Sequence, residues 1–419
     1  WFSSWLWPIT CFDGINNPGN PDMKYYYPTS DLVTAPEILF FWVARMIIAG
    51  YEFTGKKPFS NVYLTGIVRD QQRRKMSKSL GNSPEPLELI EKYGADGLRV
   101  GMLLCSPAGN DLLYNDSLPE QGRNFANKIW NAFRLVKSWK IDEKIAQPEA
   151  SALAVEWMEE MFNRTLGEID SDFRKYRISE ALMKTYKLFW DEFSGWYLEI
   201  IKPEYQKPVD LKTYNATISI FERLMQVIHP FMPFITEEIW HLISERKEGE
   251  SIMVSRMPVH KKHHDRFIHR FEVAKEIISA IRAIRKEKNI PQADKLDLYI
   301  KTDNSYDGYY LPVIRKMCNL NEIKYTEEKV QDAISFLVRT IEYYIPVRTK
   351  VDTAEELKRT REELEYTKGF LAIVMKKLDN EKFIRSAPSD VVERERKKQA
   401  DALVKIKALE EKIKELENR

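Results

Sequence analysis

The sequence has few cysteines for its length, three in 419 residues. Cys11, Cys105 and Cys318 stand far apart and are odd in number. They cannot supply a four-cysteine zinc site, and they do not suggest a disulfide framework. Free thiols of this kind fit a reducing compartment. The sequence therefore predicts a cytoplasmic protein in which this chain holds no metal ion, no zinc and no tightly bound cofactor.

Long apolar runs and an excess of charge are also lacking. Without a stretch of about twenty apolar residues, no membrane span is expected, and the first residues lack the pattern of a signal peptide. The net charge is only +2, although 65 basic and 63 acidic residues produce it. Basic surfaces must therefore be sought segment by segment. The chain begins at Trp1 without an initiator Met, and we expect it to be part of a longer protein.

Residues 74–82 are crowded with cations and hydroxyls. Their sequence is Arg-Lys-Met-Ser-Lys-Ser-Leu-Gly-Asn, and we call this segment the lysine loop. Lysine is a compact charge on a flexible stem, and hydroxyls and backbone N–H groups near a glycine can add donors. The pattern favours a loop that closes over a phosphate group. A solvated basic turn is the alternative for any short cluster of this kind.

The segment before the lysine loop has the pattern of a parallel β-sheet unit. Residues 31–34 and 61–68 are predicted strands, and residues 36–49 between them form an apolar helix that Gly50 ends. Because this helix is apolar nearly all round, we expect it to be buried. Ligands of parallel sheets bind at the carboxyl ends of the strands, which is where the lysine loop lies.

Amphipathic helices dominate the middle of the chain. Apolar residues recur at helical spacing over about 151–171, 178–200 and 211–228, which predicts a helical bundle. Thr236 follows two prolines and is predicted to cap the next helix. His229 lacks a nucleophilic neighbour, which argues against a catalytic role.

Two further features of the middle segment leave alternatives open. A solvated loop is more plausible than a metal site for His260, His263 and His264, which have no acidic or cysteine partners. The helix 266–288 ends in a basic face that either meets phosphates or is solvated. The cations of this face are Arg282, Arg285, Lys286 and Lys288.

Residues 290–350 predict a small α+β module, and the tail has the clearest periodicity. Leucines recur every seventh residue from Leu357 to Leu378, and a break follows at residues 386–388. Two helices of matched length favour an antiparallel coiled-coil hairpin over a dimer between chains. Basic residues that include Arg394 and Lys397 cluster toward the turn, where they could reach a nucleic-acid backbone or remain solvated.

Taken together, these segments resemble class I aminoacyl-tRNA synthetases. The lysine loop is similar to the second signature motif of that class, and several segments resemble valyl-tRNA synthetases. The isoleucyl enzymes and a non-catalytic tRNA-binding protein built from synthetase parts remain alternatives. The segments that carry the resemblance are residues 1–8, 38–46, 69–70 with 75–82, 92–96, 106–111, 123–131 and 229–240.

The resemblance implies a multidomain, mainly α protein. Residues 1–120 would be the remnant of an α/β, Rossmann-type catalytic domain, and residues 121–289 a helical anticodon-binding domain. The α+β module of residues 290–350 and a coiled-coil, tRNA-binding arm in residues 351–419 would follow. The implied reaction is the ATP-dependent activation of valine and its transfer to tRNA(Val), with Mg²⁺ accompanying ATP. A monomer is expected.

The resemblance also assigns roles to individual residues. It implies that Lys75 and Lys78 are catalytic and that Trp1 and Ile38 line a valine pocket. ATP-binding is implied for Gly66, Val68, Ser77, Lys78 and Ser79, and tRNA-binding for Lys128, Asn131, Leu135, Arg394 and Lys397.

The sequence departs from the family pattern in three ways. Arg73 stands where the family usually has Gly, and Glu37 follows Ala-Pro where a Gly-x-Asp is more usual. The His-Ile-Gly-His type motif and the editing domain of the family are not found in this chain. We therefore expect the isolated chain neither to activate valine nor to edit.

Overall fold

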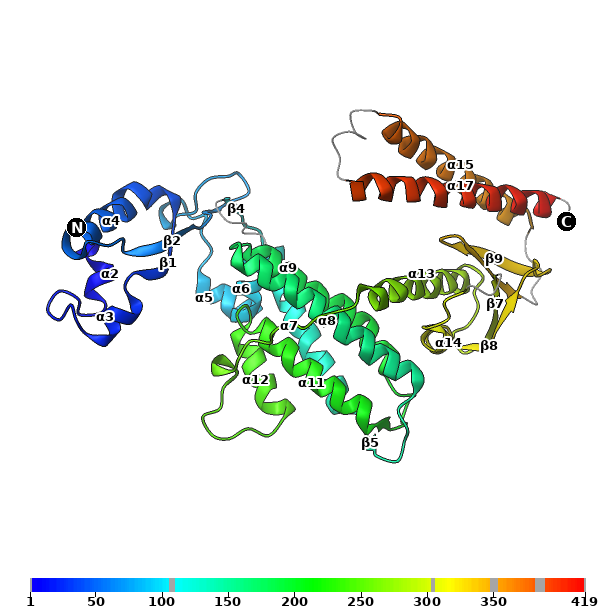
Figure 1. Ribbon diagram of the computed structural model, residues 1–419, viewed down its shortest axis with the longest axis horizontal. Coiled ribbons are helices and arrows are strands. Elements are labelled where there is room, and N and C mark those ends of the chain that lie inside the picture. The colour runs from blue at the N-terminus through cyan, green and yellow to red at the C-terminus, as the bar shows by residue number, and fades with distance from the viewer. Residues whose placement is uncertain (1, 105–109, 303–305, 347–352, 381–388, 418–419) are drawn as a thin grey trace. The chain divides into compact units, whose positions relative to one another are not determined.

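The computed structural model describes residues 2–104, 110–302, 306–346, 353–380 and 389–417. The chain divides into two compact units, residues 1–265 and residues 266–419, which follow one another from blue to red in Figure 1. Among the described helices, none has the length and apolar character that crossing a membrane requires.

The first unit begins with a small parallel sheet. Strand β1 (Thr29–Thr34) pairs with β2 (Phe59–Leu64) in parallel, with Thr29 opposite Phe59. This confirms the predicted strand–helix–strand unit. The other elements of this segment are α1 (Phe2–Trp5), α2 (Trp7–Thr10), α3 (Pro21–Tyr26), η1 (Pro36–Ile38), η2 (Leu39–Val43) and α4 (Ala44–Thr54).

The helix between these strands ends later than predicted. It continues through α4 to Thr54, where Gly55 with φ of 68° forms a left-handed cap. Gly50 lies inside the helix, where an added Cβ would approach the carbonyl oxygen of Lys56 at 2.9 Å. The prediction that Gly50 ends the helix is wrong, because this glycine serves a close approach of the chain.

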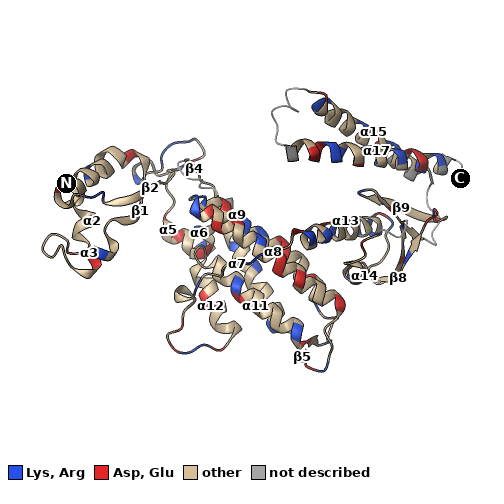
Figure 2. Cartoon of the chain, in the orientation of Figure 1, with Lys and Arg blue, Asp and Glu red and all other residues tan. Residues whose placement is uncertain are grey.

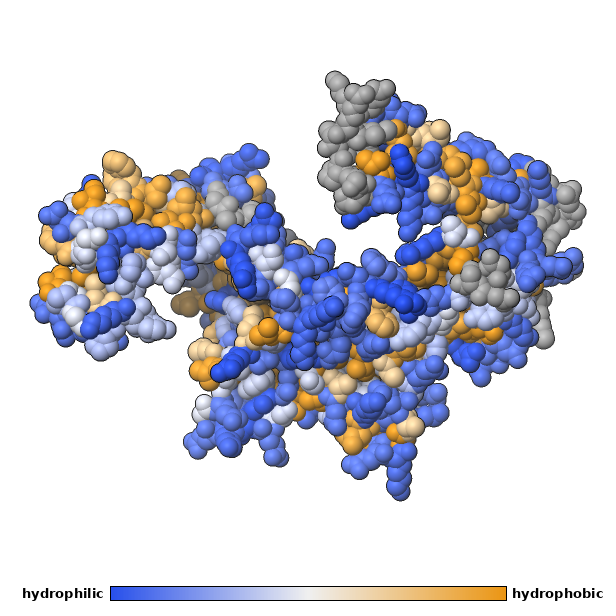
Figure 3. Space-filling view, in the orientation of Figure 1, coloured by the Kyte–Doolittle hydropathy of each residue, from blue (hydrophilic) through white to orange (hydrophobic). Residues whose placement is uncertain are grey.

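The same helix is only half-buried. Val43 and Met46 pack on Phe59, whereas Phe40 is 76% exposed and Ile48 65% exposed. Figure 3 shows the apolar surface over this segment. The prediction of full burial is wrong, because the sheet has only two strands among the described residues and leaves the outer helix face uncovered.

The predicted strand 61–68 is interrupted. Strand β2 ends at Leu64, and Val68 begins a separate strand, β3 (Val68–Arg69), which pairs in parallel with β4 (Leu112–Leu113). Gly66 lies at the break, where an added Cβ would lie 1.7 Å from the carbonyl oxygen of Asn110. Only glycine fits this approach of the two chain segments.

Helices follow the lysine loop and form a bundle. The helix predicted over 211–228 is confirmed as α11 at these bounds, and the core of the bundle contains the buried side chains of Phe125, Trp157 and Phe221. The elements in order are η3 (Lys78–Leu80), α5 (Pro86–Tyr93), α6 (Ala95–Leu104), α7 (Ser117–Lys137), β5 (Ile141–Asp142), α8 (Glu149–Arg174), α9 (Ile178–Lys187), η4 (Leu188–Tyr197), α10 (Leu198–Ile201), β6 (Val209–Asp210), α11 (Leu211–Ile228), α12 (Pro233–Ile243) and η5 (Ile252–Val254).

A buried carboxylate on α6 caps α12. The Asp96 carboxylate accepts hydrogen bonds from the N–H groups of Phe234 at 3.3 Å and Ile235 at 2.7 Å. Burial raises the pKa of Asp96, although these donors oppose the shift. Thr236 lies inside α12, and its hydroxyl donates to the carbonyl oxygen of Met232 at 2.7 Å. The prediction that Thr236 is the cap is wrong, because a distant residue takes that role.

The second unit contains α13 (Asp265–Glu287) and a four-stranded sheet in the order β8-β7-β10-β9. Strands β7 and β8 run in parallel, and β10 runs antiparallel to both β7 and β9. Strands and the helix α14 thus occur together in this part of the chain, as predicted for an α+β module. Their bounds are β7 (Leu296–Lys301), α14 (Leu311–Cys318), β8 (Leu320–Thr326), β9 (Ala333–Val338) and β10 (Ile341–Pro346).

Two long helices end the chain, α15 (Thr353–Leu378) and α17 (Ser389–Glu417). They pack side by side in Figure 1. Ion pairs join Lys377 to Glu395 at 3.8 Å and Glu363 to Lys405 at 2.7 Å. Earlier residues of α15 thus meet later residues of α17, so the two helices run antiparallel. The predicted break at 386–388 lies outside the described residues.

Arg285 is not part of a solvated basic face. Its side chain is 1% exposed, and its guanidinium donates at 2.8 Å to the carbonyl oxygens of Pro291, Asp294 and Cys318. Neither alternative considered for this residue is therefore right. Arg285 holds the end of α13 to the loop before β7 and to the end of α14, and burial lowers its pKa.

Replacing Arg285 by Ala should destabilise the second unit by about 3 kcal/mol, because three buried carbonyl groups lose a charged donor. All ten Trp precede residue 266, so Trp fluorescence reports only on the first unit, and the second unit needs another measurement. In the variant, hydrogen exchange of the β7 and β8 amides should become about a hundredfold faster than in the wild type. The matched control is Lys286→Ala on the exposed side of α13; equal rates in the two variants would contradict this role.

Candidate functional site

The lysine loop is built as a hairpin followed by a short helix. Residues Arg69 and Lys75 form an antiparallel bridge, and the N–H of Asp70 donates to the carbonyl oxygen of Arg74 at 2.9 Å. Ser77 then caps η3, because its hydroxyl accepts a hydrogen bond from the N–H of Leu80 at 3.3 Å. The loop therefore has a defined backbone in which Lys78 begins a turn of 3-10 helix.

Asp70 is the buried acid at the base of this hairpin. Its carboxylate accepts hydrogen bonds from the N–H and Nε of Arg74, both at 2.8 Å, and from Nδ2 of Asn82 at 2.9 Å. The hydrogen bond from Asn82 is the largest of the causes that lower the pKa of Asp70 to about 2. The carboxylate thus stays ionised near neutral pH.

The two lysines of the loop differ in their partners. Lys75 Nζ lies 3.7 Å from the carboxylate of Glu37, and both side chains are exposed. In the part of the chain that the structure describes, no carboxylate lies within ion-pair distance of Lys78, which is exposed. The hydroxyls of Ser77 and Ser79 are 3.1 Å apart. Lys78 is therefore available to an anionic ligand.

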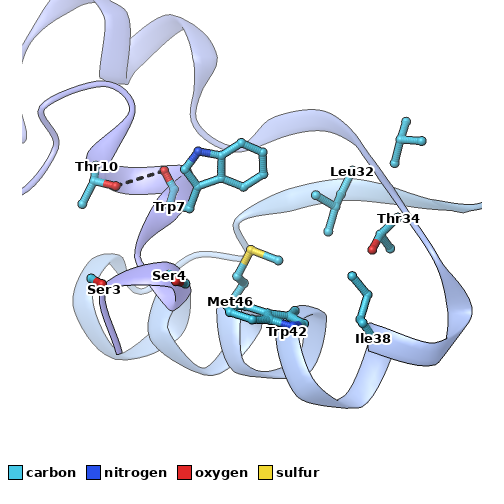
Figure 4. A pocket seen from close by; sticks show the side chains of 10 residues that line it. Ser3, Ser4, Trp7, Thr10, Leu32, Thr34, Ile38, Trp42 and Met46 are labelled. Carbon is cyan, nitrogen blue, oxygen red and sulfur yellow. Dashed lines mark hydrogen bonds between the residues drawn. The ribbon is translucent and has the colours of Figure 1, made fainter. Parts of the chain in front are cut away.

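A pocket of about 530 Å³ includes Ile38, the residue that follows Glu37 in the sequence. Its lining is mixed, because six apolar residues share it with the hydroxyl side chains of Ser3, Ser4, Thr10 and Thr34. Ile38 lines it as predicted, and Trp42 and Met46 follow at helical spacing; Figure 4 shows all three. Their four-residue spacing in the sequence was a signal that could have identified them. Trp1, also predicted here, lies outside the described residues. The Lys75–Glu37 contact brings the lysine loop to the segment that lines the pocket.

Gly66 and Val68, predicted to bind ATP, lie on the approach to the lysine loop. Gly66 backs onto Asn110, and Val68 pairs with Leu112. Asp111 binds the same segment, which links β2 to β3. Its carboxylate accepts a hydrogen bond from the N–H of Ile67 at 3.2 Å and forms an ion pair with Arg69. These hydrogen bonds hold the pKa of Asp111 below its usual value.

The predicted tRNA-binding residues form two separate sets. Lys128, Asn131 and Leu135 share one face of α7, because they are three and then four residues apart. Lys128 Nζ lies 5.3 Å from the ring centroid of Trp190. Arg394 and Lys397 are exposed on α17, where basic and acidic residues alternate in Figure 2. The two sets belong to different units of the chain.

Several histidines of the first unit have protein partners. His229 Nδ1 lies 2.7 Å from the hydroxyl of Thr236, and burial lowers the pKa of His229. His264 Nδ1 lies 3.2 Å from the carboxylate of Glu160, and His263 Nε2 lies 3.5 Å from that of Asp265. The prediction that these two histidines have no acidic partners is wrong, because one carboxylate is nearby in the sequence and the other comes from a distant helix. Over the described ranges of the chain, no group of three His, Cys, Asp or Glu residues could hold a metal ion.

Family profiles match three parts of the chain. Residues 1–115 match the tRNA synthetases class I (I, L, M and V), and residues 155–300 match the anticodon-binding domain of tRNA ligase. Residues 352–417 match the valyl tRNA synthetase tRNA binding arm. The three profiles follow the same order as the predicted parts of the chain.

Curated relatives match nearly the whole chain. The valine–tRNA ligase of Parabacteroides distasonis is 59% identical over 99% of this chain and 47% of that protein. Those of Bacteroides thetaiotaomicron and Enterococcus faecalis are 56% and 36% identical, each over 99% of this chain. The chain spans about half the length of these relatives. The isoleucyl alternative is not favoured, because these relatives are valine–tRNA ligases.

Arg73 should tolerate replacement by Gly. Its φ of 63° lies in the left-handed region, which costs a residue with a Cβ about 1–2 kcal/mol. We expect Arg73→Gly to leave the stability of the first unit unchanged or raise it by up to about 1 kcal/mol, measured by urea unfolding with Trp fluorescence. Gln72→Gly is the control and should lower stability by about 0.5–1 kcal/mol. A larger loss for Arg73→Gly than for the control would contradict the strain.

Proposed function

Because the chain belongs to the valyl-tRNA synthetase family, we propose that the protein it comes from activates valine with ATP and transfers the valyl group to tRNA(Val). In the first step a carboxylate oxygen of valine bonds to the α-phosphorus of ATP, and the bond to the β-phosphate oxygen breaks. Valyl-adenylate and pyrophosphate result. In the second step the valyl group moves to the terminal ribose of the tRNA, and AMP leaves.

The observation that carries this proposal is the position of the lysine loop. Lys75 of the loop contacts Glu37, so the loop lies beside Ile38 and thus beside the pocket. An aliphatic side chain in that pocket and phosphates under the loop would occupy neighbouring sites. A pocket of this kind separates aliphatic side chains by only about 1–3 kcal/mol per methylene, so it fits valine without excluding close relatives strongly.

Lys78 is the residue to which we assign stabilisation of the leaving pyrophosphate. It is exposed and begins η3, whose N-terminal cap Ser77 carries a hydroxyl close to that of Ser79. Charge develops on the β- and γ-phosphates as pyrophosphate leaves, and a cation placed there lowers the barrier without covalent chemistry. Lys75 would assist after leaving Glu37, because an exposed ion pair of this kind is weak. Mg²⁺ would arrive with ATP, bound by the phosphates.

Two surfaces are proposed to bind tRNA(Val). The first is the face of α7 that carries Lys128, Asn131 and Leu135, within the anticodon-binding bundle. The second is a coiled-coil arm made by α15 and α17, with Arg394 and Lys397 facing the phosphate backbone. Leu364 of α15 and Leu409 of α17 are buried. Because the chain covers its own apolar seam in this way, we propose a monomer, located in the cytoplasm.

Aminoacylation by the full-length protein tests the proposed function. We expect valine-dependent ATP–pyrophosphate exchange and charging of tRNA(Val) with valine. Charging of tRNA(Ile) with isoleucine in preference would replace this proposal by the isoleucyl alternative. Binding of tRNA without any exchange activity would favour a non-catalytic tRNA-binding protein.

Replacing Lys75 and Lys78 one at a time should show that the two lysines contribute unequally to ATP–pyrophosphate exchange. In the full-length protein, Lys78→Ala should lower kcat for ATP–pyrophosphate exchange by about 100–1,000-fold, and Lys78→Arg should restore only part of it, since the guanidinium has a different shape. Lys75→Ala should cost about tenfold. Equal losses at the two positions, or a loss confined to the KM for valine, would contradict these roles.

Replacing Lys128 should affect the tRNA alone. Lys128→Ala should raise the KM for tRNA(Val) about three- to tenfold and reduce the salt dependence of binding by about one phosphate contact. Exchange without tRNA should be unchanged. The matched control is Lys137→Ala, on the opposite face of α7, which should leave the KM for tRNA within about twofold. A change in exchange activity would show that Lys128 acts elsewhere.

A further inference from the structure

The side chain of Asn82 closes the lysine loop. Its Nδ2 donates to the carboxylate of Asp70 at 2.9 Å and to the carbonyl oxygen of Lys75 at 3.4 Å, and its Oδ1 accepts from the N–H of Ser77 at 2.9 Å. The amide group of Asn82, at the end of the loop, thus joins Asp70 ahead of the loop to Lys75 and Ser77 within it. Both the oxygen and the nitrogen of the amide form hydrogen bonds.

Asp70 anchors the other end of this connection. Its carboxylate is also held by the backbone and the guanidinium of Arg74, which fixes the hairpin from which the loop departs. We call Asp70 and Asn82 together the loop brace. Because the pKa of Asp70 is about 2, the brace keeps its charge across the range in which a synthetase is assayed.

The brace acts on the residue that precedes Lys78. The N–H of Ser77 donates a hydrogen bond to the amide oxygen of Asn82, while the hydroxyl of Ser77 caps η3. The position of η3, and so the point from which the Lys78 side chain extends, depends on where Ser77 is held. Neither Asp70 nor Asn82 needs to touch a ligand for this effect.

We propose that Asp70 and Asn82 are positioning residues that set the lysine loop so that Lys78 meets the departing pyrophosphate. This inference rests on the proposed function. It adds two residues to the proposed site. They act through Lys78, and only on the formation of valyl-adenylate. Transfer of the valyl group from adenylate to tRNA does not involve the leaving pyrophosphate, so it should not depend on the brace.

A swap of the two side chains tests the brace in the full-length protein. Asn82→Asp puts two carboxylates within about 3 Å of each other, where like charges repel. Asp70→Asn removes the charge that holds Arg74. In the double variant Asp70→Asn/Asn82→Asp, the amide at position 70 can donate a hydrogen bond to the carboxylate at position 82. That carboxylate can still accept a hydrogen bond from the N–H of Ser77. Each single variant should lower kcat for ATP–pyrophosphate exchange about 10–100-fold, with the KM for valine unchanged, and the double variant should recover about tenfold.

Two measurements distinguish positioning from mere folding. Transfer of valine from preformed valyl-adenylate to tRNA(Val), followed in a single turnover, should stay within about twofold of the wild type in every variant. Gln71→Glu is the matched control, because it adds a charge on an exposed residue of the same hairpin; its exchange activity should stay within about threefold.

The outcomes separate this inference from the proposed function. An inactive wild-type protein would overturn the proposed function itself. An active wild type with unaffected single variants would overturn only the brace. Equal losses in exchange and transfer, or no recovery in the double variant, would show that Asp70 and Asn82 stabilise the fold without positioning Lys78.

Discussion

The contact between Asp96 and the start of α12 joins the segment that carries the lysine loop to the helical bundle. A carboxylate at a helix N-terminus satisfies N–H groups that have no partner within the helix and interacts favourably with the helix dipole. Arg99, one turn later on α6, donates to the carbonyl oxygens of Pro230 and Phe231 at 3.0 and 3.2 Å. The negative charge of Asp96 and the positive charge of Arg99 thus hold the turn at residues 230–235, which leads into α12. Because α5 and α6 follow the lysine loop in the sequence, these contacts tie the segment that carries the loop to α12 of the bundle.

The sequence predicted those features that depend on neighbouring residues. Periodicity located α11 at its observed bounds, and the composition of residues 74–82 identified a loop with an available cation. Features that depend on distant residues were missed. Asp96 caps a helix that begins more than 130 residues later, and Arg285 is buried against carbonyl groups of three separate positions. No spacing in the sequence reveals such partners.

The uncovered face near the pocket has a different physical reason. Apolar residues around the whole of a helix show what that helix can bury, but they do not show whether this chain supplies a covering element. Phe40 and Ile48 remain exposed beside a two-stranded sheet. A sheet of two strands is narrow, so it covers only one face of the helix that packs on it. The prediction of full burial assumed neighbours that the described residues do not contain, whereas the family resemblance was enough to assign Ile38 to a pocket.

The ion pairs around the lysine loop explain why Lys78 suits phosphate chemistry better than Arg69, Arg74 and Lys75. Arg69 is paired with Asp111, Arg74 with Asp70 and Lys75 with Glu37. A phosphate that recruits one of these cations must first compete with a carboxylate. Over the described residues no carboxylate is paired with Lys78, so its full charge is available to a ligand. The nearly balanced net charge of the chain therefore hides a local difference between cations. Arg69, Arg74 and Lys75 are paired with carboxylates, whereas Lys78 has no carboxylate partner among the residues that the structure describes.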